Sequence, residues 1–122
     1  MGKFVIRKTA TGVKFDLKAG NGETVAASEV YETEAACRKG IESVRKNGET
    51  AKLLDLTEEE SKPVTNPKYE LFQDKAGAFR FRLKARNGGV IAVSEAYSTK
   101  AACLNGIESV RKNAPDSQIE TE

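Results

Sequence analysis

Apolar and polar residues alternate along short segments near the start of the chain. In residues 13–19, valine, phenylalanine, leucine and alanine occupy every second position, and lysines and an aspartate stand between them. This two-residue period predicts a β-strand with one buried face. Residues 4–8 predict a strand before it, with Phe4 and Ile6 facing the core, and residues 25–27 predict a third strand.

The period changes after the third predicted strand, which indicates a helix ending near Asn47. Thr33 stands where an N-cap residue is expected. The apolar stripe of this helix is Cys37, Ile41 and Val44. Gly40 lies beside the stripe, although glycine inside a helix costs about 0.8 to 1 kcal/mol relative to alanine. We therefore expect the helix to come very close there to the sheet or to a partner helix.

This unit occurs twice in the chain. The segment 15–47 recurs as 81–113, and the block Gly-Ile-Glu-Ser-Val-Arg-Lys-Asn is identical in both copies. The second copy predicts the same elements, with a first strand at 69–73 and a helix capped by Thr99. Two copies are too few for a solenoid, so the duplication indicates one molecule with pseudo-two-fold symmetry and a shared core.

The turn between the second and third predicted strands decides how they pair. A two-residue Asn-Gly loop would turn Val25 to solvent, whereas a three-residue loop, Gly20-Asn21-Gly22, keeps it inside. We predict the three-residue loop because it places apolar residues opposite each other in both copies. The pairs it predicts are Leu17 with Val25, Phe15 with Ala27, Leu83 with Ile91 and Phe81 with Val93.

Each unit ends in a further short segment. Residues 51–56 predict a fourth strand, and 117–121 predict a weaker, more polar equivalent. The acidic, proline-containing segment 57–66 predicts a linker between a first repeat, 1–56, and a second repeat, 67–122. We therefore expect an α+β fold in which two β-β-β-α-(β) repeats form one antiparallel sheet with both helices on one face.

One residue pattern is kept in full by both copies: Phe15-x-Leu17-Lys18-Ala19-x-Asn21-Gly22, then Ser28-x-x-Tyr31, then Gly40-Ile41-x-Ser43-Val44-x-x-Asn47. This pattern resembles the YegP-like family of small bacterial proteins. The resemblance implies a unit of three strands, a helix and a strand, used as a tandem repeat or a dimer. It also implies that the last strands are exchanged between units within a single sheet. It implies no activity and no catalytic residues.

Composition narrows the classes of function. The 122 residues include 20 basic and 18 acidic side chains, so a formal net charge of +2 creates no global field for nucleic acid or anionic lipid. No histidine is present, which excludes Ser-His-Asp and Cys-His nucleophiles and histidine-containing zinc sites. No apolar stretch of about 18 residues and no secretory signal occurs. We expect a cytoplasmic protein that is not an enzyme and holds no cofactor or metal.

The outward face of the predicted sheet is the first candidate binding surface. It carries Lys14, Lys18, Phe72, Arg80, Arg82 and Lys84. Arginines and an aromatic ring on an open sheet are suited to single-stranded nucleic acid, through phosphate contact and base stacking. The same residue types also occur on a solvated or protein-contacting sheet face, and the sequence leaves both interpretations open.

A second candidate lies at the junction between strand and helix in each repeat. Ser28 with Tyr31, and Ser94 with Tyr97, are shared by both copies and are suited to a small polar pocket or a weak enzyme site. No histidine is available to activate either serine. The tyrosines are equally suited to packing their rings while their hydroxyls reach a backbone group.

The repeated cysteines and arginines also have alternative roles. Cys37 and Cys103 are suited to burial as small hydrophobes, to redox chemistry, or to a disulfide with each other. Arg45 and Arg111 complement the negative end of a helix, and the asparagine that follows is suited to a left-handed cap; ligand binding is the alternative. We predict a non-enzymatic binding or interaction module, monomeric and not membrane-bound, whose partner is a protein or single-stranded nucleic acid.

Overall fold

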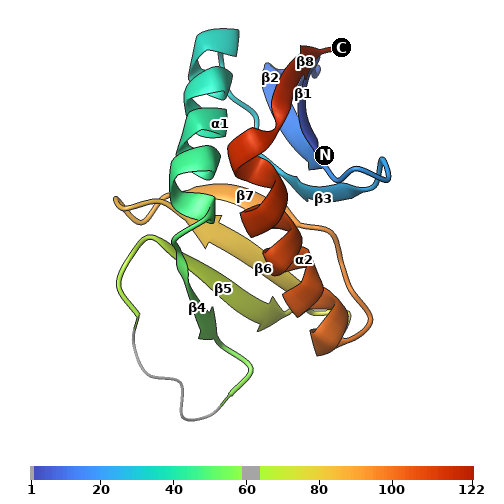
Figure 1. The fold of residues 1–122 in the computed structure, drawn as a ribbon, viewed down its shortest axis with the longest axis vertical. Coiled ribbons are helices and arrows are strands. Elements are labelled where there is room, and N and C mark those ends of the chain that lie inside the picture. Colours follow the sequence, from blue (N-terminus) through green and yellow to red (C-terminus); the bar gives the residue numbers. More distant parts are fainter. Residues whose placement is uncertain (1, 59–63) are drawn as a thin grey trace.

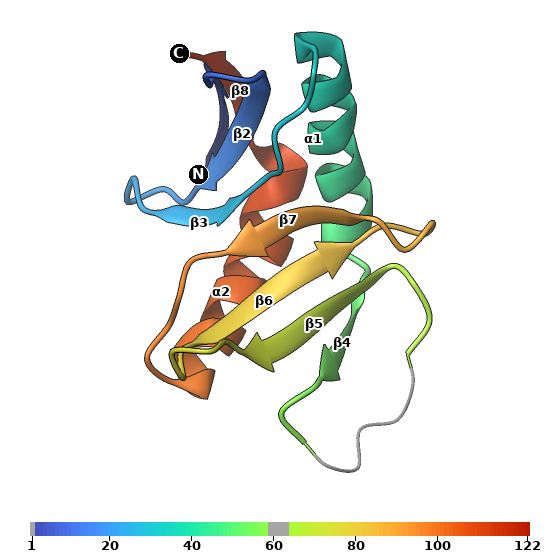
Figure 2. The same cartoon turned by 180° about the vertical axis from the view of Figure 1, so that it is seen from behind.

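The computed structural model describes residues 2–58 and 64–122, which form one mixed sheet with two helices on one face (Figure 1). The opposite face of the sheet is open, as the view from behind shows (Figure 2). The elements are β1 (Lys3–Lys8), β2 (Val13–Lys18), β3 (Thr24–Ala27), α1 (Glu34–Gly48), β4 (Lys52–Asp55), β5 (Lys68–Gln73), β6 (Phe79–Lys84), β7 (Val90–Ser94), α2 (Lys100–Asn113), the 3-10 helix η1 (Ala114–Asp116) and β8 (Gln118–Thr121).

The strands follow each other in the order β4-β5-β6-β7-β3-β2-β1-β8. All inner pairs are antiparallel, but β4 pairs parallel to β5 and β8 pairs parallel to β1. The expected antiparallel sheet is therefore mixed at its two edges. The exchange of last strands is confirmed, and so is the fourth strand of the second repeat. Residues 59–63 of the predicted linker lie outside the described part of the chain.

The hairpin between β2 and β3 has the predicted loop but not the predicted pairing. The Ala19 N–H donates to the Glu23 carbonyl at 2.9 Å, and Gly22 has φ +87°, as a three-residue loop requires. A β-bulge between Leu17 and Lys18 then shifts the register, so that Leu17 faces Ala26.

The bulge reverses the faces of the residues beyond it. The predicted pairs of Leu17 with Val25 and Phe15 with Ala27 are therefore wrong, because Ala26 turns inward beside Val25 and Ala27 turns outward beside Asp16. The second repeat has the same bulge and contradicts the equivalent predictions. There Leu83 faces Ala92 rather than Ile91, and Val93 faces Arg82 rather than Phe81.

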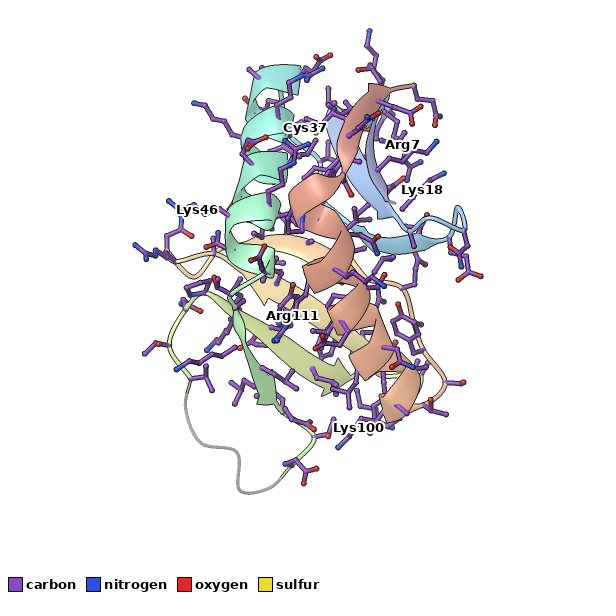
Figure 3. All side chains as sticks on the ribbon, in the orientation of Figure 1. Arg7, Lys18, Cys37, Lys46, Lys100 and Arg111 are labelled. Carbon is purple, nitrogen blue, oxygen red and sulfur yellow. The ribbon has the colours of Figure 1, made fainter. Side chains whose placement is uncertain are left out.

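One core is shared by both repeats, as the duplication predicts. Phe4 packs edge-to-face on Phe15 in the first repeat, and Tyr69 packs in the same way on Phe81 in the second. Cys37 and Cys103 are free and fully buried in this core, which contradicts a disulfide between them. Cys37 lies on the side of α1 that faces β1 and β2 (Figure 3). Burial raises the pKa of the Cys103 thiol to about 11, so this thiol is protonated at neutral pH.

The helices begin as predicted but end differently. The Thr33 and Thr99 hydroxyls accept the N–H groups of Ala36 and Ala102 at 3.1 Å, as N-caps. The left-handed asparagine cap is wrong, because no described residue other than glycine has a positive φ. Asn47 instead stays helical and donates from its side chain to the Ser43 carbonyl and hydroxyl one turn earlier.

The two repeated arginines hold the exchanged strands. Arg111 on α2 donates to the Ala51 carbonyl, just before β4, at 2.8 Å, and its guanidinium lies 5.3 Å from the centre of the Tyr69 ring on β5. Figure 3 shows Arg111 on the inner side of α2. Arg45 on α1 likewise donates to the Ser117 carbonyl before β8 and lies over Phe4 of β1. Each arginine thus fixes the other repeat's last strand beside its new neighbour.

Replacing Arg111 by alanine removes a charge-assisted hydrogen bond and a cation–π contact. We expect the free energy of unfolding to fall by about 2 kcal/mol, together with faster amide exchange in β4. Denaturant unfolding and hydrogen exchange measure the two effects. Lys112→Ala, one residue further and exposed, is the control and should change stability by less than about 0.5 kcal/mol. Equal effects of the two substitutions would contradict the strand-holding role of Arg111.

The glycine inside each helix receives a tyrosine ring. A Cβ on Gly106 would lie 2.5 Å from the Tyr97 hydroxyl oxygen and 3.0 Å from the Phe81 ring. Gly40 stands in the same relation to Tyr31 and Phe15. The expected close approach is confirmed, and the partner at each glycine is an aromatic pair of the same repeat.

Gly106→Ala is therefore expected to destabilise the fold despite the better helix propensity of alanine. Overpacking costs about 1 to 3 kcal/mol, which exceeds the gain of about 1 kcal/mol from propensity. In a Tyr97→Ala background only the tight contact with the Phe81 ring remains, so the same substitution should cost clearly less. Thermal or denaturant unfolding of the four variants forms the cycle, and an equal cost of Gly106→Ala in both backgrounds would refute the packing explanation.

Candidate functional site

The predicted surface residues all lie on the open face of the sheet. Their strand neighbours Phe15, Leu17, Phe81 and Leu83 are buried on the helix side, so Lys14 and Lys18 on β2 point the other way. Phe72 on β5 and Arg80, Arg82 and Lys84 on β6 share that face. The structure brings these four together, whereas β7 and β3 separate them from the two lysines of β2.

Neighbouring strands add charges that sequence reasoning missed. The cations of this face are Lys3, Arg7, Lys14, Lys18, Lys52, Lys68, Arg80, Arg82 and Lys84, and its carboxylates are Asp16, Glu70 and Glu120. The face has a formal excess of six positive charges, although the whole chain carries only +2. Lys52 belongs to the first repeat and joins the second only through strand exchange, so the only signal for its position was the family resemblance.

A cluster around Glu70 neutralises much of the predicted surface. Glu70 is only 5% exposed and accepts from Arg82 at 2.6 Å, while the ammonium groups of Lys84 and Lys68 lie 3.2 and 3.6 Å away. Arg82 also covers Phe72, with its guanidinium 4.6 Å from the ring centre. Of the six predicted residues, Phe72, Arg82 and Lys84 therefore already have partners within the protein.

Other cations of the face remain available. Arg7 pairs with Asp16 at 2.9 Å and Lys3 pairs with Glu120 at 3.1 Å. Within the described residues, Lys14, Lys18 and Lys52 make no ion pair. Arg80 uses one guanidinium nitrogen on the Ser94 carbonyl at 2.9 Å and also meets no carboxylate in that part of the chain. These four cations therefore have no carboxylate partner in the described residues and are available to bind an external anion.

The two serines of the second candidate site have structural roles. Ser28 is buried; its hydroxyl accepts the Phe15 N–H at 2.9 Å and donates to the Glu29 carbonyl at 2.7 Å. Ser94 repeats both bonds with Phe81 and Glu95. Each serine hydroxyl therefore forms hydrogen bonds with one backbone N–H group and one backbone carbonyl near the end of its hairpin. Neither hydroxyl is free to act as a nucleophile.

The tyrosine rings of that site lie against the helix glycines, Tyr31 at Gly40 and Tyr97 at Gly106. Tyr97 borders a groove of about 610 Å³ between the β2–β3 hairpin of the first repeat and α2 of the second. The groove is lined by Ala19, Asn21, Glu23, Thr24, Val25, Glu95, Tyr97, Ala102, Asn105, Gly106 and Ser109. Neither Ser28 nor Ser94 lines it. The predicted serine-tyrosine pocket is therefore replaced by a groove between the two repeats, which only the folded arrangement brings together.

The described residues offer no metal-binding group of three or more cysteine or acidic side chains. Neither α1 nor α2, within that same part of the chain, is long and apolar enough to cross a membrane.

Because of the Glu70 cluster, we expect the free energy of unfolding to depend on pH in the acidic range. Burial by itself would raise the pKa of Glu70, but hydrogen bonds from Arg82 and Lys84 outweigh it and lower the pKa below the usual 4.5. Because the folded-state pKa is depressed, the stabilisation is complete above the unfolded-state pKa and is lost as pH falls through the folded value. Glu70→Gln should cost about 1 to 2 kcal/mol at pH 7 and less below pH 4.

Denaturant unfolding at several pH values measures this difference. Glu120→Gln, which changes an exposed carboxylate on the same face, is the control and should leave the pH profile nearly unchanged. A Glu70→Gln profile parallel to that of the unmodified protein would show that the cluster does not stabilise the fold.

Comparison with known proteins agrees with the fold. Residues 9–55 and 74–120 each match the family described as "Domain of unknown function (DUF1508)". The UPF0339 protein YegP of Yersinia pestis is 40% identical over 114 residues, covering 93% of this chain and 88% of that protein. A UPF0339 protein of Treponema denticola is 67% identical over 52 residues, which is 43% of this chain but 90% of that relative. That relative therefore has about the length of one repeat.

A solved structure has the same architecture along nearly the whole chain. The solution NMR structure of yegP from E. coli, a protein of unknown function, superimposes with a TM-score of 0.79. It is 34% identical and the match covers 99% of this chain and 92% of that one. Two matched repeats, relatives over most of the chain and a shared fold lead to one conclusion: the chain belongs to the DUF1508 family, the YegP-like UPF0339 proteins, in its tandem-repeat form.

Proposed function

We propose that this protein is a non-enzymatic binding module that holds single-stranded nucleic acid on the open face of its sheet. The observation that carries the proposal is the excess of six positive charges on that face in a chain that is nearly neutral overall. Charge that is concentrated on one open surface favours a polyanionic partner. The twisted open sheet also offers an extended path for a flexible strand.

The absence of enzymatic activity is part of the proposal. The chain contains no histidine, Ser28 and Ser94 are bonded to backbone groups, and both thiols are buried. Burial raises the pKa of the Cys37 thiol, which makes it a poor nucleophile. The free thiols also support placing the module in the reducing cytoplasm.

The uncompensated cations define where phosphates would bind. Lys14 and Lys18 lie four residues apart on β2, and Lys52 and Arg80 lie in the other half of the sheet. Four phosphate contacts on a single strand predict a slope of log K against log salt of about −3. The outward-facing Ala27 and Val93 between the halves are small, so they leave the path across the sheet open. Base stacking contributes little, because Arg82 already covers Phe72.

The test is the double substitution Lys14→Glu plus Lys18→Glu, since neither lysine makes an ion pair in the described structure. Fluorescence anisotropy with a labelled single-stranded oligonucleotide should show affinity falling about tenfold or more at low salt, and the salt slope losing about 1.4. The substitution should not alter folding, because both side chains are on the outer face.

The matched control is Lys39→Glu plus Lys112→Glu, which makes the same change in net charge on the exposed sides of the two helices. This control should retain most of the affinity. Equal weakening by both double variants would show that affinity depends on net charge alone and would contradict binding on the sheet face. No binding of the unmodified protein at low salt would refute the proposed function.

A further inference from the structure

The groove between the β2–β3 hairpin and α2 is a second surface, with chemistry opposite to that of the open sheet face. From its lining residues we infer that it binds an alkylammonium group, supplied by a free amine or by a lysine side chain of a partner. This inference does not depend on nucleic-acid binding. It rests on which polar groups in the groove are already occupied and which are not.

Part of the groove lining is committed to local structure. The Asn21 side-chain oxygen accepts the Glu23 N–H at 3.0 Å, and the Ser109 hydroxyl accepts from Asn113 at 3.0 Å. These two acceptor oxygens are therefore already occupied, and the groups that carry them shape the groove.

Tyr97 carries a polar group of the groove that has no partner within the described residues. Its hydroxyl lies over Gly106, where a side chain of any size would displace it, and makes no hydrogen bond within the described residues. In contrast, the Tyr69 hydroxyl is bonded to the Gly48 carbonyl at 2.6 Å. Burial raises the pKa of Tyr97, and the charges of Cys103, Glu95 and Glu23 raise it further, so both carboxylates act on the phenol.

The groove combines negative charge with apolar contact. Glu23 and Glu95 make no ion pair in the described part of the chain, and no lysine or arginine lines the groove. Ala19, Val25 and Ala102 offer apolar surface beside them. An alkylammonium ligand matches all three features, because its charge meets the carboxylates and the aromatic ring while its methylene stem lies on the apolar residues. The volume of about 610 Å³ is in the usual range for small-molecule sites.

The pseudo-symmetry provides an internal comparison. At the equivalent positions of the other repeat, Glu23 is replaced by Gly89 and Asn105 by Lys39, whereas Tyr31 and Glu29 are retained. The charges that raise the pKa of Tyr31 come from Cys37 and Glu29, without a second carboxylate from the hairpin. Of the two equivalent places, therefore, one carries both carboxylates, and its counterpart carries a cation, Lys39, that repels the same ligand.

The experiment is a titration followed by the ¹⁵N–¹H NMR spectrum of the full chain. The probes are 1,4-diaminobutane and N-acetyl-lysine methylamide, which represent a free amine and a lysine side chain. Saturable shifts should be centred on Glu23, Glu95, Tyr97 and Asn105, with a dissociation constant in the range of about 0.1 to 10 mM. The probe with the higher affinity identifies the source of the alkylammonium group.

Two sets of variants decide the outcome. Glu23→Gln plus Glu95→Gln should weaken binding about tenfold, whereas Glu29→Gln, in the counterpart, should leave it unchanged. Gly89→Glu plus Lys39→Asn should create a second saturable site around Tyr31. The inference is overturned if MgCl₂ at the same ionic strength reproduces the shifts, or if the double glutamine variant binds both amines as well as the unmodified protein.

Discussion

The exchange of the two final strands is the constraint on which the rest of this structure depends. Neither repeat completes its own half of the sheet, because β4 leaves the first repeat to pair with β5 and β8 leaves the second to pair with β1. Between the two halves, the β3–β7 ladder has two residue pairs, Ala26 with Ser94 and Ala27 with Val93. This central seam is narrow, so the exchanged strands and the arginines that hold them supply much of the connection between the repeats.

The sequence was sufficient for those features that depend on local periodicity. The strand alternation around Phe15 and Phe81, the caps at Thr33 and Thr99 and the close approach at Gly40 all follow from the residues themselves. Pairing across the hairpin did not, because a β-bulge adds one residue without changing the loop that precedes it. Val25 and Ala26 are both apolar, so hydrophobicity alone does not reveal which of them faces Leu17.

The candidate site was harder to predict because its chemistry depends on neighbours that are distant in the sequence. Outward positions on β2 and β6 were correctly identified, but which of their cations are free is decided by Glu70, an acidic residue on an adjacent strand. The roles of Arg45 and Arg111 could not be inferred from a helix end, since their acceptors are carbonyl groups of the other repeat. The groove at Tyr97 likewise exists only where a hairpin of one repeat meets a helix of the other.

The covalent union of the two repeats has a consequence beyond architecture. In an assembly of two identical single-repeat chains, every substitution occurs twice. Pairing of the exchanged strands there also depends on the concentration of the chains. Here the partner strand is tethered, so pairing proceeds at a high effective concentration that dilution does not change. Tethering also allows each copy to vary separately. The equivalent positions 16 and 82, for example, hold an aspartate in the first repeat and an arginine in the second. A single chain can therefore carry two repeats with different surfaces, as a heterodimer does, and this arrangement does not depend on the concentration of the protein.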